Sequence, residues 1–311
     1  MLGEKIKLYR ESKNMTQGEI AEILGVKAAT ISKYEAGTLE PNIESLKRLA
    51  ELFDISIDEL LKEDTFDISK INILEVLREQ KNMKLKGNLY HNTQITFAYN
   101  TNHIEGSKLT EDQTRYIYET NTLLTEKDSI IDLDDVLETT NHFKLVDYML
   151  EIADKKLTEK IIKEFHKILK EGTSDSRKDW FVVGDYKELP NEVGGMQTAL
   201  PEEVPDRIEE LLAEYNAKEE KTFEDILDFH VKFERIHPFQ DGNGRVGRLI
   251  MFKECLKYNI VPFIIEDNLK MFYYRGLKEW EYEKGYLTDT CLTAQDRYKA
   301  FLDYFRIPYN E

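Results

Sequence analysis

The sequence predicts a mostly α-helical protein. Through most of its 311 residues, apolar side chains recur at a spacing of three to four, as in Ile161, Phe165, Ile168 and Leu169. Period-two alternation is scarce, and the chain holds only 15 glycines and 7 prolines. There is no repeat of fixed period and no low-complexity tract. Hydrophobic residues make up 41% of the composition, which is enough for a sizeable core and excludes wholesale disorder.

The composition also excludes several classes of protein. No apolar run approaches the roughly 20 residues of a membrane-spanning helix, so we expect no membrane association. The opening residues, MLGEKIKLYRESKN, are charged from the fourth onward, and we expect no signal peptide. Two cysteines, Cys255 and Cys291, cannot form a disulfide framework and favour a reducing cytoplasm. We expect the protein to be bacterial. The net charge of −17 repels phosphate, so a nucleotide or nucleic-acid site must depend on local positive charge and main-chain amides.

The first predicted domain spans residues 1–64. Thr16 and Glu19 fit the capping box that starts a helix, and Gly25 allows the tight turn that ends it. A second short helix follows from Lys27 to Glu35. Two short helices joined by a three-residue turn are typical of the helix-turn-helix, whose second helix lies in the major groove of DNA.

Residues 4–62 resemble the phage-repressor-type (Xre-like) helix-turn-helix. The residues that carry the resemblance are Gln17, Ala21, Gly25, Ile31, Ser32, Glu35 and Gly37. The resemblance implies DNA binding, with Gln17 on a phosphate and Ala28, Ala29 and Lys33 facing base edges. Residues 1–64 hold 13 acidic and only 9 basic residues, which is unfavourable on DNA, so a protein-docking or dimerising role is the alternative. Repressor-type modules bind as dimers, and we therefore expect a homodimer.

One segment departs from the helical pattern. Residues 180–201 concentrate glycine and proline around short β-prone runs, which predicts a β-hairpin or an extended loop. The rest of the chain is expected to divide into a helical connector at 65–89, a second domain at 90–285 and a C-terminal helical extension at 286–311.

The segment 237–248, HPFQDGNGRVGR, contains the residues best suited to chemistry. A helix delivers His237, and Pro238 stops that helix. The Gly-rich turn that follows leads into the start of another helix. At a helix start, free N–H groups and the helix dipole favour the binding of an anion. Arg245 and Arg248 add fixed positive charge suited to phosphate.

Two side chains complete this predicted site. Asp241 is a natural oxygen ligand for Mg²⁺, which needs only one or two protein carboxylates plus substrate phosphates. His237 titrates in the range suited to accepting a proton from a hydroxyl. A base, a metal ligand, an anion-binding turn and two arginines within twelve residues predict phosphoryl or nucleotidyl transfer.

Residues 237–248 match the Fic signature H-P-F-x-[D/E]-G-N-G-R-x-x-R at every fixed position, and the resemblance extends over roughly residues 90–285. It implies an all-α Fic domain with a small β-hairpin flap, which transfers AMP from ATP to a Ser, Thr or Tyr hydroxyl of a target protein and releases pyrophosphate. The chain itself is one candidate target. By position, His237 would deprotonate the hydroxyl, Asp241 would hold Mg²⁺, and Arg248 would hold the γ-phosphate. The residues implied to bind ATP are Gly242, Asn243, Gly244, Arg245, Arg248, Tyr274 and Leu277.

Residues 272–277, FYYRGL, resemble the helix that lines the family's adenine pocket. Tyr274 and Leu277 would face the base there. Relatives carry Asn four residues on, where this chain has Glu281, which leaves the base preference open. Packing in the core is the alternative role of these aromatic residues.

The flap predicted at 180–201 also acquires a role from the family. It would pair main chain to main chain with an extended stretch of the target and so position the hydroxyl. Asn191, Glu192 and Val193 are the candidates for its contacting edge, and a plain surface loop is the alternative.

Residues 101–106, TNHIEG, match the [S/T]-x-x-x-E-[G/N] inhibitory motif of Fic proteins, at the end of a helix predicted over 92–106. The residues implied are Thr101, Glu105 and Gly106. An ion pair between Glu105 and Arg248 would occupy the side chain needed for the γ-phosphate and misplace the α-phosphate, and a misplacement of about 1 Å can lower a rate on the order of a hundredfold. Alternatively, Glu105 would orient a water that removes AMP from a modified protein.

Three functions therefore compete. The favoured one is an Mg²⁺- and ATP-dependent adenylyltransferase, inhibited by its own Glu105 and fused to a DNA-binding module. The second is a transcriptional regulator whose Fic domain senses nucleotide, and the third is a protein that mainly removes AMP. No metal-ligand spacing links the other histidines, which are His91, His103, His142, His166 and His230.

Overall fold

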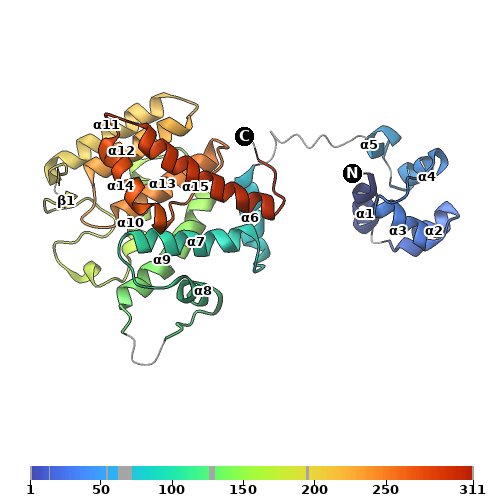
Figure 1. Cartoon of the computed structure of the whole chain (residues 1–311), viewed down its shortest axis with the longest axis horizontal. Coiled ribbons are helices and arrows are strands. Elements are labelled where there is room, and N and C mark those ends of the chain that lie inside the picture. The colour runs from blue at the N-terminus through green and yellow to red at the C-terminus, as the bar shows by residue number, and fades with distance from the viewer. Residues whose placement is uncertain are drawn as a thin grey trace. The chain divides into compact units, whose positions relative to one another are not determined.

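A computed structural model describes residues 2–13, 15–53, 55–61, 72–125, 130–193 and 196–309 of the protein (Figure 1). The chain divides into two compact units, residues 1–70 and 71–311. Helices dominate both units, and the described residues contribute a single two-stranded sheet. The predicted fold class, mostly α with a small β-hairpin, is confirmed. No helix in the described ranges combines the length and apolar character that crossing a membrane requires.

The first unit is a bundle of short helices. They are α1 (Leu2–Ser12), α2 (Gln17–Leu24), α3 (Ala28–Glu35), α4 (Ile43–Phe53) and α5 (Ile57–Leu61). The capping box of Thr16 and Glu19 is formed in both directions, and Gly25 ends α2 with a φ of 69°. The adjacent α2 and α3 pack together around a core that includes Ile6, Ile20, Ile31, Leu49 and Leu60. The predicted helix-turn-helix is therefore present.

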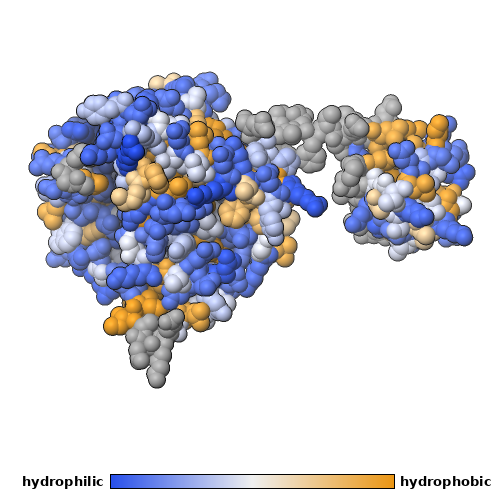
Figure 2. Space-filling model, in the orientation of Figure 1, coloured by the Kyte–Doolittle hydropathy of each residue, from blue (hydrophilic) through white to orange (hydrophobic). Residues whose placement is uncertain are grey.

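The second unit surrounds one buried helix. Its helices are α6 (Ile73–Met83), α7 (Leu89–Ile104), α8 (Glu111–Thr120), α9 (Leu133–Ile152), α10 (Glu159–Lys170), α11 (Val204–Ala217), α12 (Phe223–Ile236), α13 (Asn243–Lys257), α14 (Lys270–Glu279) and α15 (Gly285–Tyr304). Helix α13 packs against α6, α7, α9, α10 and α12, and 13 of its 15 residues are buried. Figure 2 shows a mostly hydrophilic outer surface with scattered apolar residues. The motif helix thus lies on a rigid scaffold.

The limits of the second unit differ from those drawn on the sequence. Residues 62–71 lie outside the described part of the chain, but α6 is not a free connector, because Ile73, Leu74 and Leu77 are buried in the main core. Helix α15 is not a separate extension either. It packs along α14, and its apolar residues enter the same cores, among them Leu287, Cys291, Tyr298 and Leu302.

Helix α7 begins earlier and ends earlier than predicted. The side chain of Asn88 caps its start, so the helix gains three residues before the predicted position 92. Its C-cap is Glu105, not Gly106, and Gly106 follows with a φ of 104°. The next helix, α8, starts after Thr110, which forms a capping box with Gln113.

The flap is a minimal hairpin. Strand β1 (Glu192–Val193) pairs antiparallel with β2 (Met196–Gln197), with Glu192 opposite Gln197. The other described residues of the 180–201 segment up to Leu200 form turns and irregular structure. A hairpin, and not only a loop, is therefore present at the predicted place.

Candidate active site

His237 lies where α12 ends. It caps that helix in the left-handed region, with a φ of 51°, and Pro238 has no N–H with which to continue the helix. The Nδ1 atom of His237 lies 3.3 Å from the carbonyl oxygen of Glu234. Because a carbonyl only accepts, Nδ1 carries the proton and Nε2 keeps its lone pair. Burial lowers the pKa of His237 to about 4, so the ring is neutral near pH 7 and able to accept a proton.

The turn after His237 is braced by a side chain of the motif itself. Asn243 exchanges two hydrogen bonds of 2.8 Å with the main chain of Phe239, one as donor and one as acceptor. Gly242 precedes α13 with a φ of 83°, and the first N–H groups of a helix have no carbonyl partner within it. The side chain expected at a phosphate is thus engaged in the turn, and the main chain of this helix start is what remains for an anion.

Gly244 lies directly against the Glu105 side chain. A Cβ atom at this position would overlap the Oε1 atom of Glu105 and would lie 2.9 Å from the Nη1 atom of Arg248. A larger residue at position 244 would therefore displace the ends of these two side chains.

Asp241 is held by two buried cations. Its Oδ2 atom accepts from Nζ of Lys170 at 2.7 Å and from Nη2 of Arg245 at 3.1 Å. Glu138 contacts the same two cations, at 2.5 Å from Nζ of Lys170 and in an ion pair with Arg245. Burial acts to raise the pKa of Asp241, but the charges of Arg245 and Lys170 outweigh it and hold that pKa well below its usual range. The carboxylate is therefore ionised at neutral pH.

The same residues decide what metal would fit. Asp241 retains 48% side-chain exposure, and its two described contacts both use Oδ2. Among the described residues, no group of three or more His, Cys, Asp or Glu side chains is placed to hold a metal. One ionised carboxylate fits Mg²⁺, which completes its shell with water and substrate phosphate, and does not fit a structural Zn²⁺ site.

Arg248 is paired with Glu105. Its Nη2 atom lies 2.5 Å from Oε1 of Glu105, while Nε donates to Oγ1 of Thr101 at 2.8 Å and Nη2 donates to the Thr101 carbonyl at 3.1 Å. Only 3% of the Arg248 side chain is exposed. Burial acts to raise the pKa of Glu105, but the guanidiniums of Arg248 and Arg245 outweigh it and lower that pKa. The structure thus places Thr101, Glu105 and Arg248 in one contact.

Helix α14 supplies one side of the site. Tyr274 donates a long hydrogen bond of 3.5 Å to the carbonyl of Ile104, and burial raises its pKa to about 12. Leu277 is partly buried against the apolar cluster around Trp280. Glu281, at the position where relatives carry Asn, is ion-paired with Arg235. Its carboxylate therefore already has a partner.

Comparison with known proteins agrees with this geometry. Residues 156–255 match the model of the Fic/DOC family, and residues 6–60 match a helix-turn-helix family. The chain joins an N-terminal helix-turn-helix domain of the Xre-like type to a Fic domain. A Fic domain-containing signalling protein from Bacteroides thetaiotaomicron has a solved structure that covers 76% of this chain and 91% of its own, with 26% identity and a TM-score of 0.57.

Two curated relatives each cover one part of the chain. The protein adenylyltransferase Fic of Aedes aegypti is 28% identical over 187 residues, which are 59% of this chain and 36% of that protein. The HTH-type transcriptional activator BcrR of Enterococcus faecalis is 48% identical over 58 residues, which are 19% of this chain and 28% of that protein. This chain therefore spans about a third of the length of either relative.

In the flap of the Fic domain, the side chain of Asn191 is engaged within the protein. Its Nδ2 atom donates to the Phe239 carbonyl at 3.0 Å, and its Oδ1 atom accepts from Lys187 and Thr198, so the main-chain contact expected of Asn191 stays a prediction. Glu192 and Val193 are exposed, as an edge for a partner strand requires.

In the helix-turn-helix domain, some of the residues predicted to contact DNA are exposed, and one is hydrogen-bonded within the protein. Ala28, Ala29 and Lys33 lie exposed on α3, as contacts to base edges require. The Nε2 atom of Gln17 donates to Oε2 of Glu35 at 2.8 Å, and the phosphate contact expected of Gln17 stays a prediction. Glu35 is also ion-paired with Arg10 at 2.6 Å.

Sequence reasoning missed Lys170 and Glu138, the two residues that orient Asp241 and Arg245. Lys170 is 1% exposed and also pairs with Asp175 at 3.1 Å. It ends an amphipathic helix, where a lysine is ordinarily solvated, and Glu138 is one acid among several on α9. No local signal distinguishes either of them.

Proposed function

We propose that this chain is an adenylyltransferase that transfers AMP from ATP to a Ser, Thr or Tyr hydroxyl of a protein. The observation that carries the proposal is the convergence of a neutral His237 with the start of α13 and its two arginines, Arg245 and Arg248. The match to the Fic/DOC family and the likeness to proteins named adenylyltransferases support it.

The reaction follows from these groups. The Nε2 atom of His237 accepts the proton of the target hydroxyl, whose oxygen forms a bond to the α-phosphorus of ATP. The bond from that phosphorus to the bridging oxygen breaks, and pyrophosphate leaves with the electron pair. The helix start and Arg245 stabilise the phosphate charge. A magnesium ion on Asp241, when bound, would neutralise further phosphate charge.

Glu105 restrains this reaction in the same proposal. It occupies Arg248, which the γ-phosphate needs, so ATP binds productively only when Glu105 leaves. The incubation of the protein with Mg²⁺ and ATP labelled at the α-phosphate tests the proposal. We expect label on the chain or on an added lysate protein, more strongly for Glu105→Gly than for the unchanged protein, and none for Glu105→Gly combined with His237→Ala. A folded Glu105→Gly variant that transfers no label would refute the proposal.

A second function is favoured by the helix-turn-helix match over residues 6–60. The N-terminal domain would bind DNA as a homodimer, reading bases with the exposed face of α3, and the Fic domain would change that affinity when it holds nucleotide. A gel shift on the DNA upstream of its own coding sequence, at low salt, tests this role. No sequence-specific shift, with or without ATP, would remove it.

The opposite reaction uses the same residues. Glu105 would then orient a water for removal of AMP from a modified protein, and Glu105→Ala would abolish that removal instead of increasing transfer.

The two free, buried cysteines, Cys255 and Cys291, support a reducing compartment such as the cytoplasm for either reaction.

A further inference from the structure

Lys187 is a buried lysine at the base of the flap. It is 3% exposed, and burial lowers its pKa to about 8. None of the described carboxylates forms an ion pair with it. A buried ammonium without a counterion is costly, so its hydrogen bonds must be favourable enough to offset the loss of water.

Those hydrogen bonds join the two ends of the flap. The Nζ atom donates to Oδ1 of Asn191 at 2.7 Å, before β1, and to Oγ1 of Thr198 at 2.7 Å, after β2. Thr198 in turn donates to Asn191, with 2.6 Å between Oγ1 and Oδ1. We call Lys187, Asn191 and Thr198 the flap anchor.

The flap anchor is also fastened to the chain on both sides of His237. The Nζ atom of Lys187 lies 3.4 Å from the carbonyl oxygen of Ile236, and its main-chain N–H donates to the carbonyl of Pro238 at 2.9 Å. Asn191 donates to the carbonyl of the next residue, Phe239, at 3.0 Å. These three connections, together with the Leu189 N–H that donates to Oε1 of Gln240 at 3.3 Å, link the flap to the segment that carries the catalytic imidazole.

An ammonium group suits this position for a geometric reason. It has three donors on one atom and no acceptor, so it can bind two side-chain oxygens and one carbonyl in three directions. A methionine of similar length fills the space with no donor, whereas an arginine keeps donors in a planar arrangement. Loss of the donors would leave the carbonyl of Ile236 and the two flap ends without a common partner.

We propose that Lys187 is a positioning residue that fixes the distance between the flap edge and Nε2 of His237. The inference rests on the proposed transfer activity and adds how the acceptor hydroxyl is located. A target strand laid on Glu192 and Val193 then arrives in register with the base. A displacement of about 1 Å between reacting groups can lower a rate on the order of a hundredfold, so a loosened flap should impair transfer while ATP binding persists.

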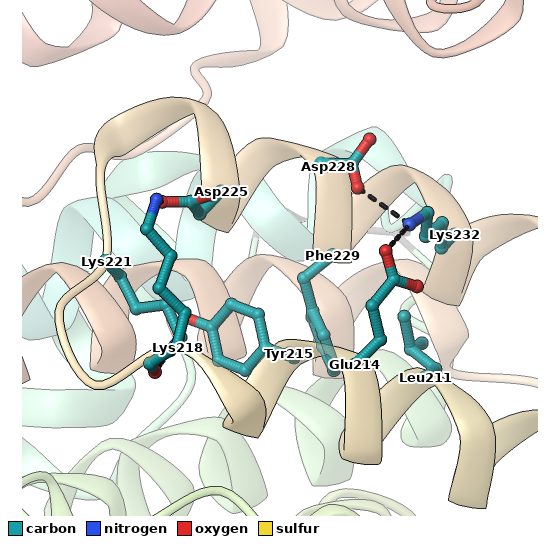
Figure 3. A pocket seen from close by; sticks show the side chains of 9 residues that line it. All are labelled: Leu211, Glu214, Tyr215, Lys218, Lys221, Asp225, Asp228, Phe229 and Lys232. Atoms are coloured by element: carbon teal, nitrogen blue, oxygen red, sulfur yellow. Dashed lines mark hydrogen bonds and ion pairs between the residues drawn. The ribbon is translucent and has the colours of Figure 1, made fainter.

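The test uses the full chain in the Glu105→Gly background, with Lys187→Met and Lys187→Arg. Lys221→Met is the matched control, because Lys221 is also buried, has a lowered pKa and lines the pocket between α11 and α12 shown in Figure 3. Lys221 lies just before the start of α12, whereas Lys187 contacts the end of that helix. The length of α12, at a rise of 1.5 Å per residue, separates the two lysines by about 20 Å.

Three measurements separate the outcomes. Hydrogen exchange followed by mass spectrometry over residues 188–199 should rise about tenfold in Lys187→Met, return towards the parent in Lys187→Arg and stay unchanged in Lys221→Met. Self-transfer of labelled AMP should fall at least about tenfold in Lys187→Met, with the ATP dissociation constant from calorimetry changed less than about twofold.

An unchanged rate of hydrogen exchange over residues 188–199 in Lys187→Met would overturn the proposed anchor. Faster exchange with undiminished transfer would overturn its coupling to His237. If the parent Glu105→Gly protein transfers no AMP, the proposed function fails, while the exchange measurement still decides whether Lys187 fixes the flap.

Discussion

Replacing Glu105 by Gln should destabilise the ATP-free protein and strengthen ATP binding at the same time. Glu105 and Arg248 are 2.5 Å apart, and the guanidinium has only 3% exposure. Removing one partner of a fully buried ion pair costs about 3–5 kcal/mol. Here the Glu105 side chain retains 29% exposure, and Arg248 keeps two hydrogen bonds to Thr101, so we expect a smaller loss, about 1–3 kcal/mol.

The same free energy should reappear in nucleotide affinity. In the unchanged protein, ATP must displace the Glu105 carboxylate before a phosphate can contact Arg248. The Gln variant has no charge to displace, so a coupling of about 1–3 kcal/mol corresponds to ATP binding about 5- to 150-fold more tightly. Stability without ligand and affinity for ligand should therefore change in opposite directions.

Urea unfolding and titration calorimetry with ATP and Mg²⁺ measure the two quantities. Glu111→Gln is the control, since Glu111 forms only an exposed pair with Arg115, and it should shift stability by less than about 1 kcal/mol. If Glu105→Gln matches the unchanged protein in both measurements, the ion pair does not restrain the site. Lower stability without tighter binding would mean that ATP does not use Arg248.

Other described contacts lead to three further predictions. Lys170→Met should lower the free energy of unfolding, measured with urea, by about 3–5 kcal/mol, because the buried lysine is ion-paired with three carboxylates. An unchanged urea midpoint would contradict this network. Burial lowers the pKa values of His142, His166 and His230 to about 3, so below pH 6.5 the unfolded chain binds more protons and stability falls. Each should cost about 2 kcal/mol at pH 5, and a urea midpoint that does not change between pH 7 and 5 would refute this. On DNA selected by the protein from random sequences, Lys33→Ala should weaken binding by about 1–3 kcal/mol in fluorescence anisotropy, and equal affinities would exclude base contact by α3.

The parts of this protein that could be predicted from sequence are those fixed by short-range geometry. A helix end, a proline, a Gly-rich turn and a helix start lie within twelve residues, so the segment 237–248 folds into a site whose order in space follows its order in the chain. The capping boxes of α2 and α8 are local in the same way.

The residues that sequence reasoning missed or misplaced depend mainly on long-range packing. Lys170 meets Asp241 across 71 positions and Glu138 across 32, and neither spacing leaves a pattern in the sequence. The side chain of Asn191 donates to the main chain of Phe239, 48 positions later, and no local pattern in the sequence indicates this contact. The early start of α7 is different, because the cap residue that sets it, Asn88, is a local signal that the sequence does contain.

The charges around the motif explain why Glu105, and not another carboxylate, is suited to control access. Three cations, Lys170, Arg245 and Arg248, lie among four carboxylates, so the local balance is already negative before an ATP anion enters. Glu138 and Asp241 each contact both Lys170 and Arg245, and removing either would leave these two buried cations with a single shared carboxylate. Among the described residues, Glu105 forms its ion pair with Arg248, and it caps the end of α7. Its departure removes one negative charge and uncovers one guanidinium, which offsets part of the charge that the nucleotide brings. Under the proposed function, release of Glu105 from Arg248 would therefore set whether the site can accept ATP.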